Sequence, residues 1–423
     1  MIIHDNIHGY IKLDPIASSI VDTPVFQRLR NIHQTGVLYL VFPTATHSRF
    51  EHSIGTYHLA NNMITNIAMK QPELKITEEI IMMVSIAGLC HDLGHLLFSH
   101  LFDDSFLEHL PNYEELKSKT ANVVHENRSI FLLNHIVETY KVQLNNAQLK
   151  VIGDLIYPKQ AEYSKWNAKY MVGKWIFQII SNPINSIDVD KFDYLTRDTM
   201  AVGMKIGFDY SRIIADAKVI DNRICYSQQC SEDIYHMFFI RYRLHRMIYN
   251  HKAVKAIEII LVEILFELEK EMNISSYIMD PHNMIKLVDS FIWKQNNEVT
   301  IKLIDMIEQR KIPKMVYQEV SLNNIMIDET KLKEQFDNNY KIIRFKVGYV
   351  GGKTNPLNHI NFYNFKTGKI IPENKSKNFS LLINTKHIEY FLRVYCLEPT
   401  LLTKMKEYFI NTSDNTDSPE LIV

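Results

Sequence analysis

An adjacent histidine and aspartate, His91 and Asp92, follow directly on an apolar run that ends at Cys90. An imidazole nitrogen and a carboxylate oxygen delivered together from a buried helix can hold a divalent metal and leave positions open for water and phosphate. Further ionisable residues recur in otherwise apolar segments, namely Arg49, Glu51, His52, His95, His100, His125, Glu126, Asp188 and Asp190. Burying so many of them without partners is costly. The pattern therefore predicts a metal-dependent phosphohydrolase.

The same segment has the outline of a zinc-protease motif, in which two histidines and a Glu general base share one helix. Here the carboxylate is Asp92, one methylene shorter than Glu, and Gly94 disfavours a continuous helix. A lone histidine on an apolar helix is more often a core residue than a ligand. The accompanying ionisable residues favour the phosphohydrolase over both alternatives.

A series of motifs resembles, in the same order, those of the HD-domain deoxynucleoside triphosphate triphosphohydrolases, most closely the eukaryotic members that also carry a sterile alpha motif domain. The motifs are Asp22–Arg30, Val41–Pro43, Ser48–Ser53, Ala87–His95, Phe98–His100, Ile187–Tyr194 and Leu244–Arg246. The match runs from about Asp5 to about Tyr408. Since it starts so early, we expect the separate sterile alpha motif domain to be absent.

Composition limits the classes of protein that fit. The chain has 423 residues, 46% of them hydrophobic and 22% charged, which is enough to bury a large core. The formal net charge of −1 disfavours nucleic acid as the main partner. Four cysteines are too few for a disulfide framework, and we find neither a signal peptide nor an apolar run long enough for a bilayer. We expect a soluble intracellular protein without membrane association, in the cytoplasm or the nucleus.

The apolar spacing is mainly helical from Ile54 to about Leu268 and approaches strand alternation at 341–350 and 359–365. We expect a mainly α fold, with an HD-domain helical core and a small C-terminal α+β lobe. The predicted division is 1–310 for the hydrolase domain, 311–410 for the lobe and 411–423 for a disordered polar tail. One or two helices over 231–271 would place Arg241, His245 and Tyr249 on one face, four residues apart.

The resemblance implies a metal site and a reaction. The implied metal ligands are His52, His91, Asp92 and Asp190, with iron, manganese or zinc at this site and Mg²⁺ accompanying the substrate phosphates. Water would attack the α-phosphorus of a deoxynucleoside triphosphate, and triphosphate would leave as one unit. The implied catalytic residues are His95, His100, Asp103, His125 and Asp188, with His100 as the proton donor. His125 could equally be a hydrogen-bonding neighbour of that donor.

The resemblance also implies how the substrate is held. Arg49, Lys191, Arg241 and Tyr194 would bind phosphates, while Gln34 and Asp198 would bind the 3′ hydroxyl. The Tyr249 ring would leave no room for a ribose 2′ hydroxyl, and His245 lies on the same predicted face. At the base, Thr35 and Asn250 differ from the family's residues, which leaves the base preference open.

Regulation is implied in part. A guanine-nucleotide pocket is represented by Asp22, Gln27, Arg30, Arg310, Ile312 and Lys314, although Met1 stands where the family has Lys. An adjoining deoxynucleotide pocket keeps Val41, Phe42, Arg212, His251 and Lys252. It has Ser227, Gln229 and Met247 in place of basic residues, and Asp233 in place of Asn. The resemblance thus implies GTP as an activator and a homo-oligomer, either a dimer or a tetramer.

Two other functions remain open on the sequence. A different HD phosphohydrolase, either a nucleotide monophosphatase or a cyclic-nucleotide phosphodiesterase, would keep the metal ligands but would not need Lys191, Arg241 and Tyr249. A catalytically idle nucleotide-binding protein is disfavoured, because every metal and acid position is filled.

Overall fold

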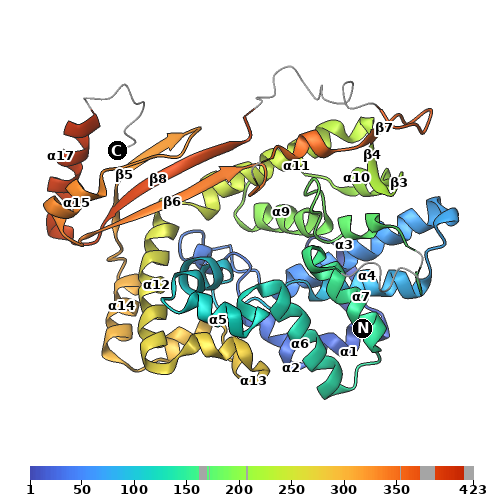
Figure 1. Ribbon diagram of the computed structural model, residues 1–423, viewed down its shortest axis with the longest axis horizontal. Helices are drawn as coiled ribbons and strands as arrows, with labels where there is room; N and C mark the ends of the chain where they lie inside the picture. The colour runs from blue at the N-terminus through green and yellow to red at the C-terminus, as the bar shows by residue number, and fades with distance from the viewer. Residues whose placement is uncertain (162–168, 171, 206–207, 353, 372–385, 414–423) are drawn as a thin grey trace. The chain divides into compact units, whose positions relative to one another are not determined.

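The computed structural model describes residues 1–161, 169–170, 172–205, 208–352, 354–371 and 386–413. The described residues are mainly helical, with small sheets (Figure 1). They form two compact units. Within its described residues, the first unit comprises Met1–Ile240, Met272–Phe291 and Pro356–Ile383. The second comprises Arg241–Glu271, Ile292–Asn355 and Asn384–Val423. The expected fold class, mainly α with a small α+β region, is confirmed.

The first unit contains most of the helices. Its elements are β1 (Ile2–Asp5), β2 (Gly9–Lys12), α1 (Pro15–Val21), α2 (Pro24–Gln27), α3 (Arg49–Lys70), α4 (Glu78–Cys90), α5 (Tyr113–Lys119), α6 (His125–Tyr140), α7 (Asn146–Ile156), α9 (Val189–Ala201), α10 (Ser211–Ala215), β3 (Lys218–Ile220), β4 (Arg223–Ser227), most of α11 (Ser231–Arg243), α13 (Pro281–Met284) and β7 (Phe362–Tyr363). Strands β1 and β2 form a hairpin, and β7 adds to β4 in parallel.

Helix α3 packs against α4 and against α9, and the residues of the predicted metal site lie in α3, in α9 and directly after α4. Helix α3 starts where the Glu51 carboxylate accepts the Ser48 backbone N–H at 2.5 Å, and α4 starts where the Thr77 hydroxyl accepts the Ile80 N–H at 3.3 Å. Gly55 lets α3 approach α9, because a Cβ there would lie 1.9 Å from the Asp193 carboxylate. Close packing of these helices therefore depends on a residue without a side chain.

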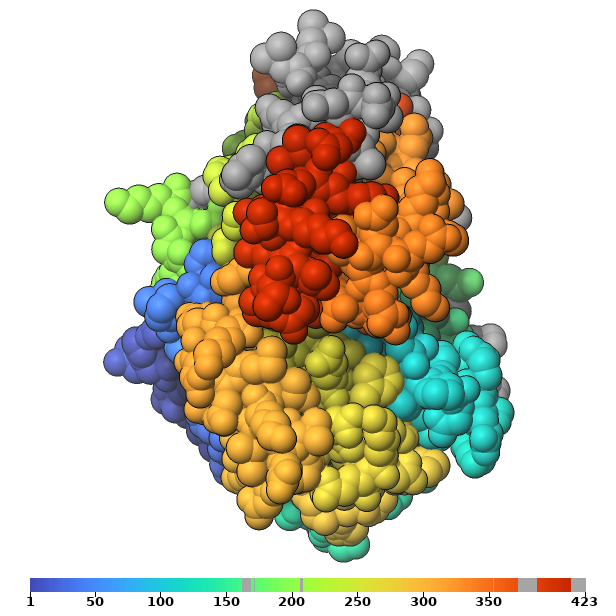
Figure 2. Space-filling view, turned by 90° about the vertical axis from the view of Figure 1, so that its left-hand side faces the viewer, coloured from blue at the N-terminus to red at the C-terminus, as the bar shows by residue number. Residues whose placement is uncertain are grey.

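The second unit contains a three-stranded antiparallel sheet in the order β5-β8-β6. Its elements are α12 (Lys252–Met272), α14 (Glu298–Glu308), β5 (Lys314–Ser321), α15 (Glu329–Phe336), β6 (Tyr340–Gly348), β8 (Ile388–Cys396) and α17 (Leu402–Ser413). One core cluster joins Leu332, Leu392 and Phe409, from α15, β8 and α17. Figure 2 shows the red helix α17 lying against orange segments of the same unit.

Several detailed expectations can be compared with this fold. The 231–271 segment contains two α-helices, α11 and α12, as expected. A π-helix over Leu244–Tyr249 separates them, so the expected α-helical period does not run unbroken from Arg241 to Tyr249. Helix α17 extends to Ser413, and the rest of the expected tail lies outside the described residues. The compact units differ from the segments 1–310 and 311–410, and that domain division stays a prediction. Among the described helices, none is long and apolar enough to cross a bilayer.

Candidate active site

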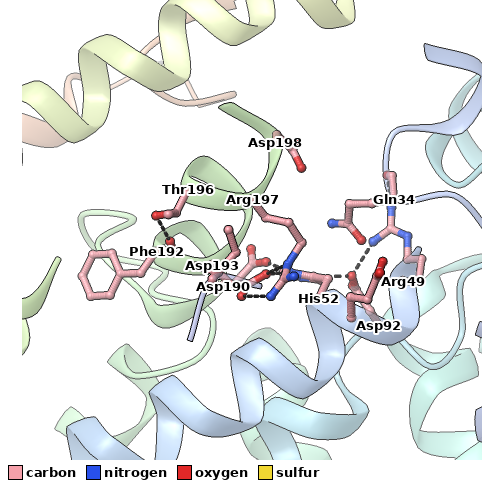
Figure 3. Close-up of polar contacts among 12 residues, drawn as sticks. Gln34, Arg49, His52, Asp92, Asp190, Phe192, Asp193, Thr196, Arg197 and Asp198 are labelled. Atoms are coloured by element: carbon pink, nitrogen blue, oxygen red, sulfur yellow. Dashed lines mark hydrogen bonds and ion pairs between the residues drawn. The ribbon is translucent and has the colours of Figure 1, made fainter. Parts of the chain in front are cut away.

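Three predicted metal ligands from distant parts of the chain, His52, His91 and Asp190, converge in the first unit, and Figure 3 shows two of them, His52 and Asp190. His52 lies in the first turn of α3, His91 caps the C-terminus of α4, and Asp190 lies in the first turn of α9. The two Nε2 atoms are 3.3 Å apart, and Asp190 Oδ1 lies 3.1 Å from His52 Nε2 and 3.5 Å from His91 Nε2. The helix packing thus brings two nitrogens and one oxygen to a single point.

The other nitrogen of each imidazole is held by an acceptor. His52 Nδ1 donates to Asp193 Oδ2 at 2.8 Å, and His91 Nδ1 donates to the Gly88 carbonyl at 2.8 Å. These bonds place a proton on each Nδ1, so in the neutral form each ring presents its Nε2 lone pair to the cluster. Two facing lone pairs beside a carboxylate repel one another unless a cation lies between them. The donor set therefore fits a divalent metal.

Asp92, the fourth predicted ligand, borders the same cluster. Its Oδ1 lies 3.4 Å from Nε2 of both His91 and His95, and its Oδ2 lies 3.4 Å from His52 Nε2 and pairs with the Arg49 guanidinium. Asp92 is 6% exposed. The Asp92 carboxylate therefore lies between the predicted metal ligands and His95.

The electrostatics of the cluster favour positive charge. Burial lowers the pKa of His52, but hydrogen bonds with Asp190, Asp193 and Asp92 outweigh it, so the pKa lies well above its usual value. Burial likewise opposes charge on Asp190, yet its bonds to His52 and His91 hold the pKa of this carboxyl below its usual range. Groups that stabilise a proton at this point would equally stabilise a metal cation.

A buried network supports His52 from the side away from the cluster. Arg197 Nε and Nη2 each donate to Asp193 at 2.8 Å, His8 Nε2 lies 2.7 Å from Asp193 Oδ1, and Arg197 also pairs with Asp5 at 2.9 Å. The sequence interpretation gave Asp193 and Arg197 no role. Their spacing of four residues in one helix was the available signal, because that spacing suits an ion pair.

The loop that follows His91 and Asp92 is a turn, and two arginine side chains hydrogen-bond to its backbone carbonyls. Helix α4 ends at Cys90, so His91 and His95 do not share one helix, and the zinc-protease alternative lacks its required geometry. Arg28 donates to the carbonyls of Leu93 and, at 2.9 Å, His95, while Arg128 Nε donates to the Gly94 carbonyl at 2.7 Å. Both arginines are buried.

Three predicted catalytic histidines gather beside this loop. The His95 ring stacks on His125 with centroids 4.2 Å apart, and His100 lies 4.9 Å from His95 and 5.7 Å from His125. Asp103 Oδ2 is 3.6 Å from His125 Nδ1, and Asp103 Oδ1 accepts from Arg128 at 2.5 Å. Burial, reinforced by neighbouring cations, holds the pKa of His95 and His125 well below the usual value. Both rings are therefore neutral at physiological pH.

Several predicted substrate-binding residues of the first unit already have partners. Lys191 Nζ lies 3.0 Å from Asp188 Oδ2, and Asp188 also caps α9 by accepting the Lys191 N–H at 3.1 Å. Asp198 Oδ1 lies 2.7 Å from His47 Nε2. Asp190, Lys191, Tyr194 and Asp198 do share helix α9, as their spacing predicted.

Two further side chains of the predicted substrate site offer unpaired polar atoms. Gln34 Oε1 and Thr35 Oγ1 are buried and have no hydrogen-bond partner in the described part of the chain. The Gln34 side chain lies beside Arg49 in Figure 3, and the Gln34 carbonyl accepts from Arg49 Nη2 at 3.3 Å. Buried polar atoms without partners are rare and mark places where a ligand can bind.

The remaining substrate candidates belong to the second unit. His245 and Tyr249 lie in the π-helix, with ring centroids 4.9 Å apart and nearly perpendicular planes. Asn250 Nδ2 donates to the His245 carbonyl at 2.8 Å, and Arg241 Nη1 donates to the Gly348 carbonyl at 2.8 Å. Although the α-helical spacing is lost, the π-helix still brings His245 against Tyr249.

The predicted regulatory residues are divided between the units. Asp22, Gln27, Arg30, Val41, Phe42 and Arg212 belong to the first, and His251, Lys252, Arg310, Ile312 and Lys314 belong to the second. Arg30 Nε donates to Gln27 Oε1 at 2.8 Å, and its guanidinium lies 3.5 Å from the centre of the Phe50 ring. These roles stay predictions, as do the assigned roles of the catalytic and substrate-binding residues.

Comparison with known proteins supports the resemblance. The chain is 34% identical to the deoxynucleoside triphosphate triphosphohydrolase SAMHD1 homolog of Dictyostelium discoideum, over 93% of this chain and 77% of that protein. It is 32% identical to human deoxynucleoside triphosphate triphosphohydrolase SAMHD1, over 97% and 72% of the two chains. A putative HD domain-containing protein, L394, of Acanthamoeba polyphaga mimivirus is 33% identical over 94% and 92%. No family model matches the sequence.

Proposed function

Because this chain belongs to the family of HD-domain deoxynucleoside triphosphate triphosphohydrolases, we propose that it hydrolyses deoxynucleoside triphosphates to deoxynucleoside and triphosphate with the help of a divalent metal. The observation that carries this proposal is the convergence of His52 Nε2, His91 Nε2 and Asp190 Oδ1 within 3.5 Å of one another. The consequence is a lower deoxynucleotide pool. Such an enzyme meets its substrates in the cytoplasm or the nucleus, where we place it.

His52, His91 and Asp190 would hold the metal together with Asp92, which lies 3.4 Å from both imidazoles. Their nitrogen and oxygen donors suit iron, manganese or zinc. When bound, the metal supplies Lewis-acid activation of the phosphoryl group and of water, while Mg²⁺ accompanies the substrate phosphates. The chain's own contribution is orientation, because Asp193 and the Gly88 carbonyl fix the two imidazoles.

Departure of the deoxyribose 5′ oxygen requires a proton, which we assign to His100. His100 is exposed, whereas His95 and Asp103 are buried beside it. Burial keeps His95 and His125 neutral. His95 would contact the α-phosphate region, and His125 would tune the proton donor together with Asp103. Asp103 lies 3.6 Å from His125 and would set the orientation of that ring.

Arg49, Lys191, Tyr194 and Arg241 supply the phosphate contacts. Arg49 and Lys191 exchange their carboxylate partners Asp92 and Asp188 for phosphate oxygens when substrate binds. Gln34 and Asp198 take the 3′ hydroxyl, and the unpaired Gln34 Oε1 supports this assignment. Tyr249 excludes the ribose 2′ hydroxyl, with His245 packed against its ring. Thr35 and Asn250 face the base.

We further propose that a guanine nucleotide such as GTP activates the enzyme as a homo-oligomer, a dimer or a tetramer. The activator pocket would use Asp22, Gln27, Arg30, Arg310, Ile312 and Lys314. An adjoining, weaker nucleotide pocket would use Val41, Phe42, Arg212, His251 and Lys252. The support is the resemblance to the family, whose residues recur at these positions.

The test is incubation of metal-loaded protein with each deoxynucleoside triphosphate, with and without GTP, followed by separation of the products. We expect deoxynucleoside and inorganic triphosphate in equal amounts. Release of orthophosphate, or hydrolysis of a cyclic nucleotide in place of the triphosphates, would assign the chain to another HD chemistry. A metal-loaded protein that turns over none of these compounds would be a nucleotide-binding protein.

A further inference from the structure

One buried carboxylate outside the metal cluster binds two separate loops of the first unit. Asp289 Oδ2 accepts the His33 backbone N–H at 2.8 Å and lies 2.7 Å from His33 Nδ1, while Asp289 Oδ1 accepts the Phe98 N–H at 2.7 Å. Asp289 is 4% exposed. It is distant in sequence from both partners, so these bonds connect three segments of the chain.

The second of these loops has a strained backbone immediately before the predicted proton donor. Phe98 and Ser99 have φ angles of 57° and 58°, in the left-handed region that residues with a Cβ rarely adopt. Such a conformation persists only where surrounding contacts hold it, and it recurs at functional sites. Here the Asp289 bond to the Phe98 N–H is one of those contacts, and His100 is the next residue but one.

The two loops also contact each other directly, through a hydrogen bond and through close packing. Ser99 Oγ donates to the His33 carbonyl at 3.0 Å and accepts from Arg49 Nε at 3.0 Å. Gly36, with a φ of +59°, lies so close that a Cβ there would be 3.2 Å from the Phe98 carbonyl oxygen. The loop that carries Gln34 and the loop that carries His100 therefore form one assembly around Asp289.

We propose that Asp289 is a positioning residue, which holds the loop of Gln34 and the loop of His100 in fixed register with Arg49. Both oxygens are needed, because one accepts from His33 and the other from Phe98. An asparagine would present its NH₂ group to one of these N–H donors and lose that bond. The proposal rests on the proposed function, which assigns the 3′ hydroxyl to Gln34 and the leaving-group proton to His100.

The test compares Asp289→Asn with Asp154→Asn, a matched control in α7 that is equally buried at 4% exposure and pairs with Lys150 at 3.0 Å. Hydrogen exchange measured by mass spectrometry should show faster exchange at 32–36 and 96–101 in Asp289→Asn alone. Metal content should stay at the wild-type value. We expect kcat for deoxynucleotides to fall about 10- to 100-fold with a smaller change in KM, because proton donation acts in the transition state.

Ser99→Ala provides a second route if Asp289→Asn does not fold, because it removes the direct tie and leaves the carboxylate in place. It should lower kcat in the same direction. Where Asp289→Asn does fold, the double variant should lose less than the product of the two single effects. Faster loop exchange with an unchanged kcat would overturn the proposal, as would an equal loss of kcat in Asp154→Asn. If the wild type hydrolyses no deoxynucleotide, both the proposed function and this proposal fail. If the wild type is active and kcat of Asp289→Asn equals the wild-type value, the positioning role alone is overturned.

Discussion

His52 and Asp193 form a hydrogen bond of 2.8 Å between side chains that are both 0% exposed. Asp193 is itself held by Arg197 and His8, so the carboxylate cannot rotate away from the imidazole. A histidine fixed in this way presents its other nitrogen in one direction and in one tautomer. The orientation of a predicted metal ligand thus depends on residues that would not touch the metal.

Replacing Asp193 with Asn should weaken metal binding. The amide is a poorer acceptor than the carboxylate and does not favour the cationic complex, so we expect metal affinity to fall about 10- to 100-fold. Competition with a chelator, read out by elemental analysis, measures this affinity. Asp154→Asn serves as the control and should keep the wild-type affinity. An unchanged affinity in Asp193→Asn would show that His52 is oriented by other contacts.

Replacing His91 with Ala should empty the metal site and abolish hydrolysis. The side chain contributes one of the two converging nitrogens and lies at the end of α4, so its truncation should leave the helical fold largely intact. Metal stoichiometry, circular dichroism and product formation together provide the measurement. Full metal content with full activity in this variant would contradict the metal-hydrolase proposal.

The sequence predicted which residues converge, but it did not predict the contacts that hold them in place. The spacing of Asp190, Lys191, Tyr194 and Asp198 correctly placed all four on one helix, because helical periodicity is a local property. The π-helix over 244–249 was missed, since local spacing does not distinguish it from an α-helix.

Long-range contacts were the other omission. The bonds from Asp289 to His33 and Phe98 join residues far apart in the chain, and no periodicity reports such a meeting. The same holds for β7, which pairs in parallel with β4 although Tyr363 and its partner in the strand register, Ser227, are far apart in the sequence. Tertiary packing decides these positions, so a single sequence cannot supply them.

Replacing Gly94 with Ala should damage both stability and activity. A Cβ there would lie 2.2 Å from the His125 carbonyl oxygen and 2.4 Å from the Ser129 nitrogen, both backbone atoms of α6. Since backbone cannot move aside cheaply, we expect a loss of about 1–3 kcal/mol in the free energy of unfolding. The shift would also displace His95 and lower kcat. Thermal or denaturant unfolding and steady-state rates measure the two effects.

Gly153→Ala is the matched control for that variant. Its Cβ would lie 3.5 Å from the Ile130 side chain, which is ordinary contact, and the position is inside helix α7. We expect activity to be unchanged and stability to rise slightly, because Ala restricts the unfolded chain. Equal damage from both substitutions would mean that the close approach at Gly94 is unimportant.

Deoxynucleotides should be hydrolysed and ribonucleotides should not. The proposed reason is the Tyr249 ring, which His245 braces from a centroid distance of 4.9 Å. Rates with dATP and ATP, each as sole substrate, measure the discrimination. Tyr249→Phe keeps the ring and should therefore keep the discrimination between dATP and ATP. Tyr249→Ala removes the ring and should allow ATP to be hydrolysed. Comparable turnover of ATP and dATP by the wild type would show that Tyr249 does not have this role.

Activation should respond to guanine nucleotide with a weakened dependence on a second, deoxynucleotide activator. The proposed second pocket has no cation at Ser227, Gln229 or Met247, and Arg212, one of its proposed basic residues, lies 4.0 Å from Asp216 and 3.9 Å from Asp233. Neutral side chains and nearby carboxylates bind triphosphate poorly. An activator can shift assembly only by as much as its differential affinity allows, so this pocket should contribute little.

Sedimentation and initial rates, measured in parallel across GTP and a non-hydrolysable deoxynucleotide, test this expectation. With guanine nucleotide present, the wild type should assemble and hydrolyse substrate. It should do so even when the deoxynucleotide activator is too dilute to occupy the proposed second pocket. The double substitution of Gln229→Lys and Asp233→Asn should strengthen the response to the deoxynucleotide, because it adds a cation and removes a carboxylate beside Arg212. An enzyme that stays monomeric and inactive until both ligands are present would contradict the prediction. It would mean that basic residues at other positions complete the pocket in place of Ser227, Gln229 and Met247.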